Sequence, residues 1–150
     1  MGARRTVATL AIPFVVGLAA VGLSAGPAAA AADGRPCAFT GDYRTMPTGN
    51  TVPVRWCPDW SPRSDGRIPV YEAPTGGSVV GWMNDTGTRT NWYVCQINGA
   101  RHDAGGYWNT WWALTMADNG QWGWVNETYF RGGGNGERDG GLPADCPPLD

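Results

Sequence analysis

The chain has 150 residues, and its 11 basic and 13 acidic side chains give a formal net charge of −2 at pH 7. This length supports one small domain with modest additions. The slightly acidic balance argues against nucleic acid or an anionic membrane surface as a partner, because binding to either requires clustered positive charge.

The first 32 residues have the organisation of a secretory signal peptide. A pair of arginines is followed by an apolar run, residues 10–23, that is too short to span a bilayer, and by a small, alanine-rich stretch, residues 24–32. Cleavage after Ala32 would release the rest of the chain to the extracellular medium, with Asp33 as its first residue. A membrane anchor is the alternative, but the small-residue end favours cleavage.

The remaining chain divides into three segments by composition. Residues 33–66 mix proline, glycine, arginine and aspartate, and we expect an irregular extension with one strand near residues 51–56. Residues 67–131 carry short β-type runs between turn residues, the pattern of an all-β sandwich or barrel. Residues 132–150 are rich in glycine and polar side chains, which is typical of a flexible tail.

No run after residue 32 has the sustained periodicity of a helix, since the 23 glycines and 12 prolines of the chain interrupt it. The expected strands, in chain order, cover residues 68–71, 78–83, 89–97, 108–116 and 121–125. The expected turns are residues 84–87 and 117–120, with a loop at 98–106 and a 3₁₀ turn at 126–129 before a last strand at Phe130. Residues 89–97 form the longest run, and alternation places Trp92, Val94 and Gln96 on one face.

Four cysteines in a short exported chain indicate two disulfides. They are Cys37, Cys57, Cys95 and Cys146, and three pairings are possible. A zinc site is the alternative, but it usually shows a close Cys-x-x-Cys pair, and the lone His102 is far from all four cysteines in sequence. We therefore expect no metal and no cofactor.

The sequence contains no recognisable catalytic group. His102 is followed by Asp103, but adjacent residues in a loop seldom face one another as base and orienting acid, so a solvated loop histidine is favoured. Glu72 and Glu127 could form a glycosidase pair only if the fold brought them together. Neither a Gly-x-Ser-x-Gly nor a His-Glu-x-x-His motif is present. We therefore expect a protein that is not an enzyme.

Several short motifs resemble those of bacterial SH3-like domains. Residues 119–125, Asn-Gly-Gln-Trp-Gly-Trp-Val, are similar to their Asn-Gly-Lys-Thr-Gly-Trp-Val turn and strand. Residues 68–74, Ile-Pro-Val-Tyr-Glu-Ala-Pro, stand where these domains have Leu-Asn-Val-Arg-Ser-Gly-Pro. Weaker similarities lie, in the family's order, at residues 78–81, 86–88, 111–114 and 129–130.

This resemblance implies a small SH3-like barrel over residues 67–131, used outside the cell to bind cell-wall peptides and often attached to a wall hydrolase. The exported actinobacterial type looks especially similar, because it combines a Tyr-x-x-Cys-Gln-like strand with a cysteine shortly after the barrel. We predict that Cys95 pairs with Cys146, which ties the tail to the longest strand, and that Cys37 pairs with Cys57. A bond between Cys57 and Cys95 would contradict this pairing.

Nine tryptophans are many for a small barrel, and they are either core filling or a binding surface. Trp112 and Leu114 share a face of their strand and match inward-facing positions of the family, and we assign Trp112 and Trp124 to the core. The candidates for an exposed ligand-binding stripe are Tyr71, Trp108, Trp111 and Trp122.

Two functional hypotheses follow from these features. The first is a secreted, non-enzymatic binding module that holds cell-wall peptide or glycan in an aromatic groove. The second is an extracellular protein-interaction or inhibitor scaffold that docks on another secreted protein. Sedimentation with purified cell walls separates them, because only the first should bind walls that carry no protein.

Overall fold

The computed structural model describes residues 37–84, 90–132, 134–138 and 140–149. The predicted signal peptide lies outside these ranges, as does most of the turn predicted at residues 84–87. In the part of the chain that is described, no helix has the length and apolar character needed to cross a membrane.

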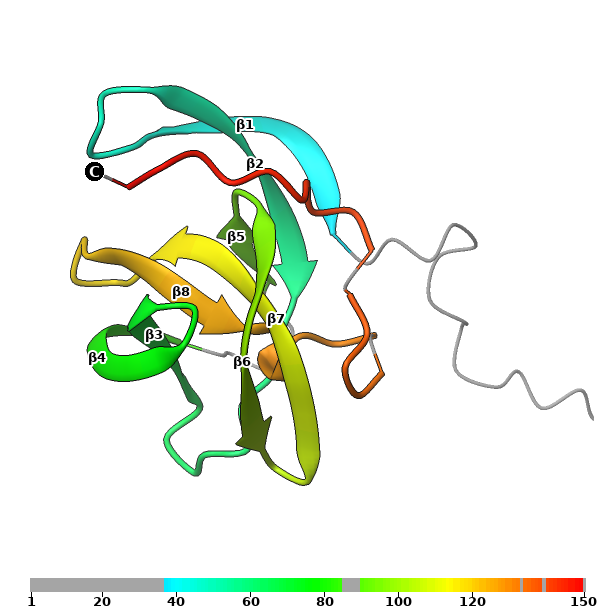
Figure 1. Ribbon diagram of the computed structural model, residues 1–150. Coiled ribbons are helices and arrows are strands. Elements are labelled where there is room, and N and C mark those ends of the chain that lie inside the picture. The colour runs from blue at the N-terminus through cyan, green and yellow to red at the C-terminus, as the bar shows by residue number, and fades with distance from the viewer. Residues whose placement is uncertain (1–36, 85–89, 133, 139, 150) are drawn as a thin grey trace, which may run out of the picture.

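Two antiparallel sheets form the described chain, which is all-β as predicted (Figure 1). The smaller sheet, in the order β1-β2-β5, contains β1 (Ala38–Thr45), β2 (Thr51–Pro58) and β5 (Thr90–Tyr93). The larger sheet, in the order β4-β3-β8-β7-β6, contains β3 (Arg67–Ala73), β4 (Gly76–Asn84), β6 (Gln96–Ala104), β7 (Tyr107–Met116) and β8 (Trp122–Asn126). The 3₁₀ turn η1 (Glu127–Tyr129) follows β8.

The larger sheet is curled but open, so the closed barrel predicted for residues 67–131 is wrong in this respect. β4 and β6 are its two edges, and no ladder joins them in the described ranges. The turn between β7 and β8 lies against β4 instead. Asp118 N–H donates to the Trp82 carbonyl and the Asn119 side-chain amide donates to the Val80 carbonyl, each with a donor–acceptor distance of 3.0 Å. Gly81 permits this approach, because a Cβ there would strike the Asn119 side chain.

The extension predicted at residues 33–66 is more regular than expected. The strand predicted near residues 51–56 is present as β2, but β1 precedes it and the two form a hairpin. β2 also pairs with β5, where Trp56 lies opposite Trp92. Most side chains of β1 are exposed, so the strand lacks the apolar alternation that would have revealed it in the sequence.

The single strand predicted at residues 89–97 is also wrong, because the chain passes there from one sheet to the other. β5 ends at Tyr93 and β6 begins at Gln96. Between them, Val94 N–H donates to the Leu114 carbonyl (2.9 Å) and Leu114 N–H donates to the Cys95 carbonyl (3.0 Å). Every residue from 93 to 96 is buried, so the chain does not alternate between an inner and an outer face here.

The loop predicted at residues 98–106 is mostly strand, because β6 continues to Ala104. It pairs with β7 along its length, with a register shift between Asn98 and His102. Its outward side chains, such as Arg101 and Asp103, are charged and solvated because β6 is an edge strand. This polarity is what suggested a loop.

Both predicted disulfides are present, Cys37–Cys57 and Cys95–Cys146. The second ties the C-terminal segment to the start of β6. Beside it, Gln96 donates from its backbone N–H to the Pro143 carbonyl (2.8 Å) and from its side-chain amide to the Leu142 carbonyl (2.7 Å).

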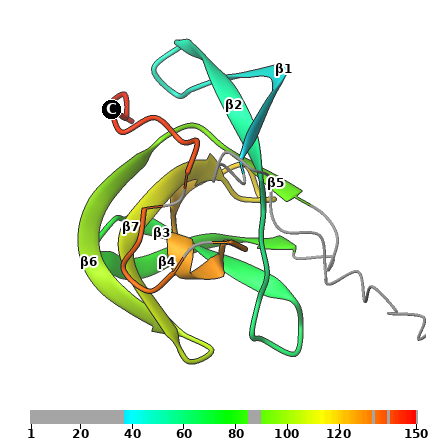
Figure 2. The same ribbon diagram turned by 90° about the vertical axis from the view of Figure 1, so that its right-hand side faces the viewer.

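Side chains pack on both faces of the larger sheet. Successive residues of β7 and β8 point to opposite faces, so they belong to two different apolar clusters. One cluster contains Ala113 and Val125. The other contains Trp112, Leu114 and Trp124, together with apolar side chains of the β1–β2 hairpin. Figure 2 shows this hairpin standing to one side of the curled sheet.

Candidate ligand-binding site

The tryptophans of the described chain are covered rather than exposed. The large apolar side chains that are more than a third exposed are Phe39, Tyr43, Val79 and Tyr107, and no tryptophan is among them. Trp112 and Trp124 are 1% and 7% exposed, as their assignment to the core predicts.

Two of the four predicted stripe residues belong to the surface of the core. The half-buried Tyr71 packs edge-on against Trp112 and His102, with ring centroids 5.5 Å apart in each pair. The half-buried Trp122 packs edge-on against Trp92 at 5.6 Å. Both are part of the cluster around Trp112.

The other two stripe residues lie beneath arginines. The guanidinium of Arg101 is 4.6 Å from the ring centroid of Trp108, and that of Arg138 is 5.4 Å from the ring centroid of Trp111. Such contacts cover an aromatic face with a cation that keeps its hydration. Among described residues no ring contact joins any two of the four candidates, so the structure does not bring these rings against one another.

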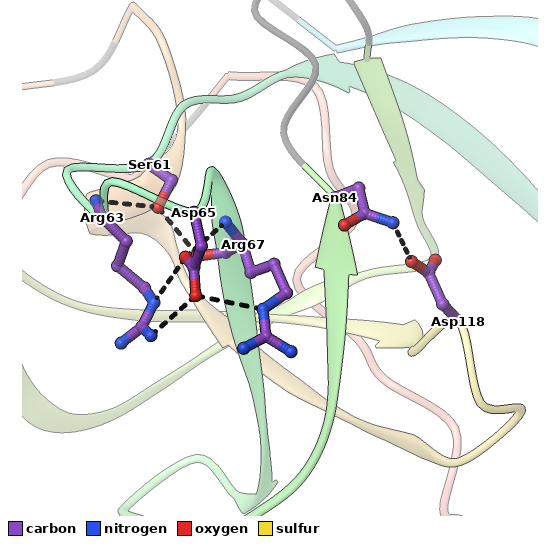
Figure 3. Close-up of polar contacts among 6 residues, drawn as sticks. All are labelled: Ser61, Arg63, Asp65, Arg67, Asn84 and Asp118. Atoms are coloured by element: carbon purple, nitrogen blue, oxygen red, sulfur yellow. Dashed lines mark hydrogen bonds and ion pairs between the residues drawn. The ribbon is translucent and has the colours of Figure 1, made fainter.

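Trp82 is covered in the same way by a charged loop between β2 and β3. The guanidinium groups of Arg63 and Arg67 lie 4.6 and 4.9 Å from its ring centroid. The Asp65 carboxylate forms an ion pair with each arginine, at 2.9 Å from Arg63 and 3.1 Å from Arg67 (Figure 3). Hydrogen bonds from Arg63 lower the pKa of Asp65. The Asp65 carboxylate is already occupied by two cations, so this cluster covers Trp82 rather than offering a site.

An open cleft of about 350 Å³ lies at the end of the β6–β7 hairpin. Its aromatic lining consists of Trp60, Tyr107, Trp108 and Phe130, and its polar lining includes Asn109, Glu127, Thr128, Arg131 and Asn135. We call this site the aromatic cleft. Trp108 is the one stripe candidate that lines it.

Trp60 and Tyr107 form the outer aromatic wall of this cleft, with ring centroids 5.6 Å apart in an edge-on contact. Trp60 is fixed because its backbone N–H donates to the Tyr129 carbonyl and its indole N–H donates to the Thr128 carbonyl, each with a donor–acceptor distance of 2.9 Å. Tyr107 follows a Gly-Gly turn in which both residues have positive φ. Gly105 is required there, because a Cβ would strike the Trp60 ring.

The polar wall is held by the segment after η1. Arg131 donates from Nε to the Asp59 carbonyl (2.6 Å), which fixes its guanidinium at the rim. The Asn135 side-chain oxygen accepts the Trp108 N–H (2.9 Å), and Gly136 N–H donates to the Trp108 carbonyl (3.1 Å). The first part of the tail therefore packs against β7 and completes the cleft.

Sequence reasoning missed Trp60 and Tyr107. Trp60 comes from the linker between β2 and β3 and Tyr107 is the first residue of β7, and only the tertiary fold brings them together. The available signal was Gly105-Gly106 followed by two aromatic residues, because a turn of this kind presents the next side chain at the tip of a hairpin.

His102 is a strand residue and half-buried, not the solvated loop residue that was predicted. Its Nε2 lies 3.2 Å from the Tyr129 hydroxyl. Asp103 is engaged by Arg101 over 2.6 Å, so it does not orient His102 as a catalytic acid would. Glu127 lines the aromatic cleft and Glu72 lines a different one, so this pair does not share a site.

Burial shifts the pKa values of His102 and Tyr129. It lowers the pKa of His102 from 6.5, and it raises the pKa of Tyr129 to about 12. Within the described ranges, no three His, Cys, Asp or Glu side chains are grouped so that they could hold a metal ion.

His102 gives a prediction for the dependence of stability on pH. Its pKa is lower in the folded chain than the value of 6.5 expected when unfolded, so the unfolded chain binds the proton more readily. The free energy of unfolding should therefore fall as the pH drops below 6.5 and level off below the folded pKa. Urea unfolding at several pH values between about 7 and about 5 measures this. The same decline in His102→Gln would contradict the assignment.

Comparisons of the chain with family models, with curated proteins and with solved structures found no match.

Proposed function

We propose that this protein is a secreted, non-enzymatic binding module of the SH3-like type that holds a cell-envelope peptide or glycan in the aromatic cleft. The observation that carries the proposal is the Trp60–Tyr107 wall, where a ring that is 57% exposed stands beside a fixed polar rim. A large exposed aromatic next to hydrogen-bonding groups is typical of a binding surface.

Several features of the cleft favour a ligand with both apolar and polar faces. Aromatic rings offer flat apolar area to a sugar ring or an extended peptide. Arg131 and Asn135 at the rim are held in place by other parts of the chain, so little conformational freedom is lost when a ligand binds. Two disulfides are typical of extracellular proteins, which is consistent with a ligand outside the cell.

The curled larger sheet supports the SH3-like part of the proposal. Two of its hairpins, β3–β4 and β7–β8, are joined through β3 and β8, where Tyr71 lies opposite Trp124. The motif at residues 119–125, whose sequence resembles the turn and strand of these domains, forms the β7–β8 turn and most of β8.

Tyr107→Ala tests the proposed function in a sedimentation assay with purified cell walls. The side chain lies at a hairpin tip and is mostly exposed, so its removal should leave the melting temperature nearly unchanged. Loss of a true anchor should weaken binding by roughly 30-fold, about 2 kcal/mol. The matched control is Tyr43→Ala, because Tyr43 is 54% exposed on β1 and does not line the cleft. Equal binding of both variants and the parent protein would contradict the proposal.

One observation favours a protein-interaction scaffold as the second candidate function. β1 is an edge of the smaller sheet, and the exposed rings of Phe39 and Tyr43 contact each other on it at 5.9 Å. An exposed edge strand with apolar side chains can pair with a strand of another protein. Loss of a protein partner from culture filtrate in Tyr43→Ala, with wall binding unaffected in Tyr107→Ala, would favour this candidate.

A further inference from the structure

A second cleft, of about 470 Å³, lies between the β3–β4 turn and the C-terminal segment. Its floor is Ile97 and Trp124, one wall is Glu72, Ala73 and Pro74, and the other wall is residues 146–149. We call it the tail groove. It shares no lining residue with the aromatic cleft.

The tail wall of this groove is fixed to the sheet rather than loosely placed. The Cys95–Cys146 disulfide anchors it at one point, and the two hydrogen bonds from Gln96 to the carbonyls of Leu142 and Pro143 anchor it a few residues earlier. Leu149 then packs on the partly buried edge of the cluster around Trp124. A groove that is already formed can bind a ligand without first ordering its own wall.

The shape and backbone of the groove favour an extended peptide recognised through its side chains. Residues 145–149 have no regular secondary structure, and Pro147 and Pro148 have no N–H to donate, so this wall cannot form a regular β-ladder with a ligand. Prolines, Leu149 and the indole of Trp124 offer apolar contact instead. Polyproline-like and other extended apolar segments bind in such aromatic-floored grooves.

The charge of the groove adds a specific requirement. Among the described residues, Glu72 is the one ionisable side chain in its lining, and it is exposed at the rim. No residue in the described ranges forms an ion pair or a hydrogen bond with its side chain. A ligand with a positive side chain next to its apolar residues would complement this carboxylate.

From these features we propose that the tail groove is a second binding site, which takes an extended apolar peptide carrying an arginine or lysine that pairs with Glu72. The disulfide-anchored C-terminal segment is part of the site, because it forms one of the two walls. The proposal is independent of the function assigned to the aromatic cleft.

The test is fluorescence anisotropy with the full chain and an end-blocked, fluorescein-labelled peptide, Ala-Leu-Pro-Leu-Arg-Ala. We expect saturable binding, which is weakened about 2–5-fold by Glu72→Gln, the range for an exposed ion pair. Leu149→Ala should have the larger effect and weaken binding about 10-fold relative to the parent protein, because it removes apolar contact from the wall while the disulfide stays intact. Tyr107→Ala is the matched control and should bind the peptide like the parent protein.

The same titration contains the outcomes that would overturn the proposal. A peptide with glutamate in place of arginine should bind worse than the parent peptide, and equal binding would remove the role of Glu72. Tighter binding by Leu149→Ala would mean that the tail blocks the groove instead of building it. Failure of the peptide to bind at concentrations up to about 1 mM would overturn the site itself.

Discussion

Trp112→Ala is expected to lower the free energy of unfolding by about 3–5 kcal/mol, the range for truncating a buried aromatic side chain. The ring is 1% exposed and packs edge-on against Tyr71 and His102. Its indole N–H also donates to the Ala100 carbonyl over 2.8 Å, so truncation leaves that acceptor without this donor. Chemical denaturation at neutral pH measures the loss as a shift of the midpoint.

Trp122→Ala is the matched control, because it removes the same side chain from a half-buried position on the next strand. Trp122 has one ring contact among the described residues, with Trp92. We therefore expect a smaller loss, about 1 kcal/mol, as for most substitutions outside a core. Equal losses in the two variants would show that burial does not separate the tryptophans into core and surface residues.

Sequence patterns predicted those parts of the fold whose local signals agree with their tertiary role. β8 was expected because Asn119-Gly120 forms a turn, with positive φ at Gly120, and an aromatic strand follows. The sequence did not predict β1 or the outer half of β6 as strands, because both lie at sheet edges and their side chains face solvent. An edge strand of this kind has the composition of a loop.

The candidate site was harder to predict than the fold because it depends on contacts between distant segments. Trp60 and Tyr107 meet only when the β2–β3 linker passes the tip of the β6–β7 hairpin. The pairing of Arg101 with Trp108 and of Arg138 with Trp111 also could not be foreseen, since no periodicity relates a cation to the ring that it covers. A count of tryptophans alone therefore overstates the exposed aromatic surface of this chain.

The disulfides correspond to the tertiary organisation more directly. Cys37 and Cys57 join β2 to the residue before β1, and Cys95 and Cys146 join the sheet crossing to the tail. Each bond ties a segment outside residues 67–131 either to a strand or to the crossing between two strands. The segments with the weakest secondary-structure signals are thus the ones that are covalently fixed.

Replacing Cys95 and Cys146 together by serine should therefore have the other large effect on stability. The bond spans 51 residues, and the loss of chain entropy that it imposes on the unfolded state corresponds to about 4 kcal/mol. The Cys37–Cys57 bond spans 20 residues, for which the same relation gives about 3 kcal/mol, so Cys37→Ser/Cys57→Ser is the matched comparison.

Without the Cys95–Cys146 bond, the tail is held by the two hydrogen bonds of Gln96 and by the packing of Leu142 and Leu149. The tail should therefore also become susceptible to proteolysis before the sheets unfold. Denaturant unfolding of both double variants, with limited proteolysis of the tail, measures these effects. A larger loss on removing the shorter loop would show that native packing, rather than restriction of the unfolded chain, determines what each bond contributes.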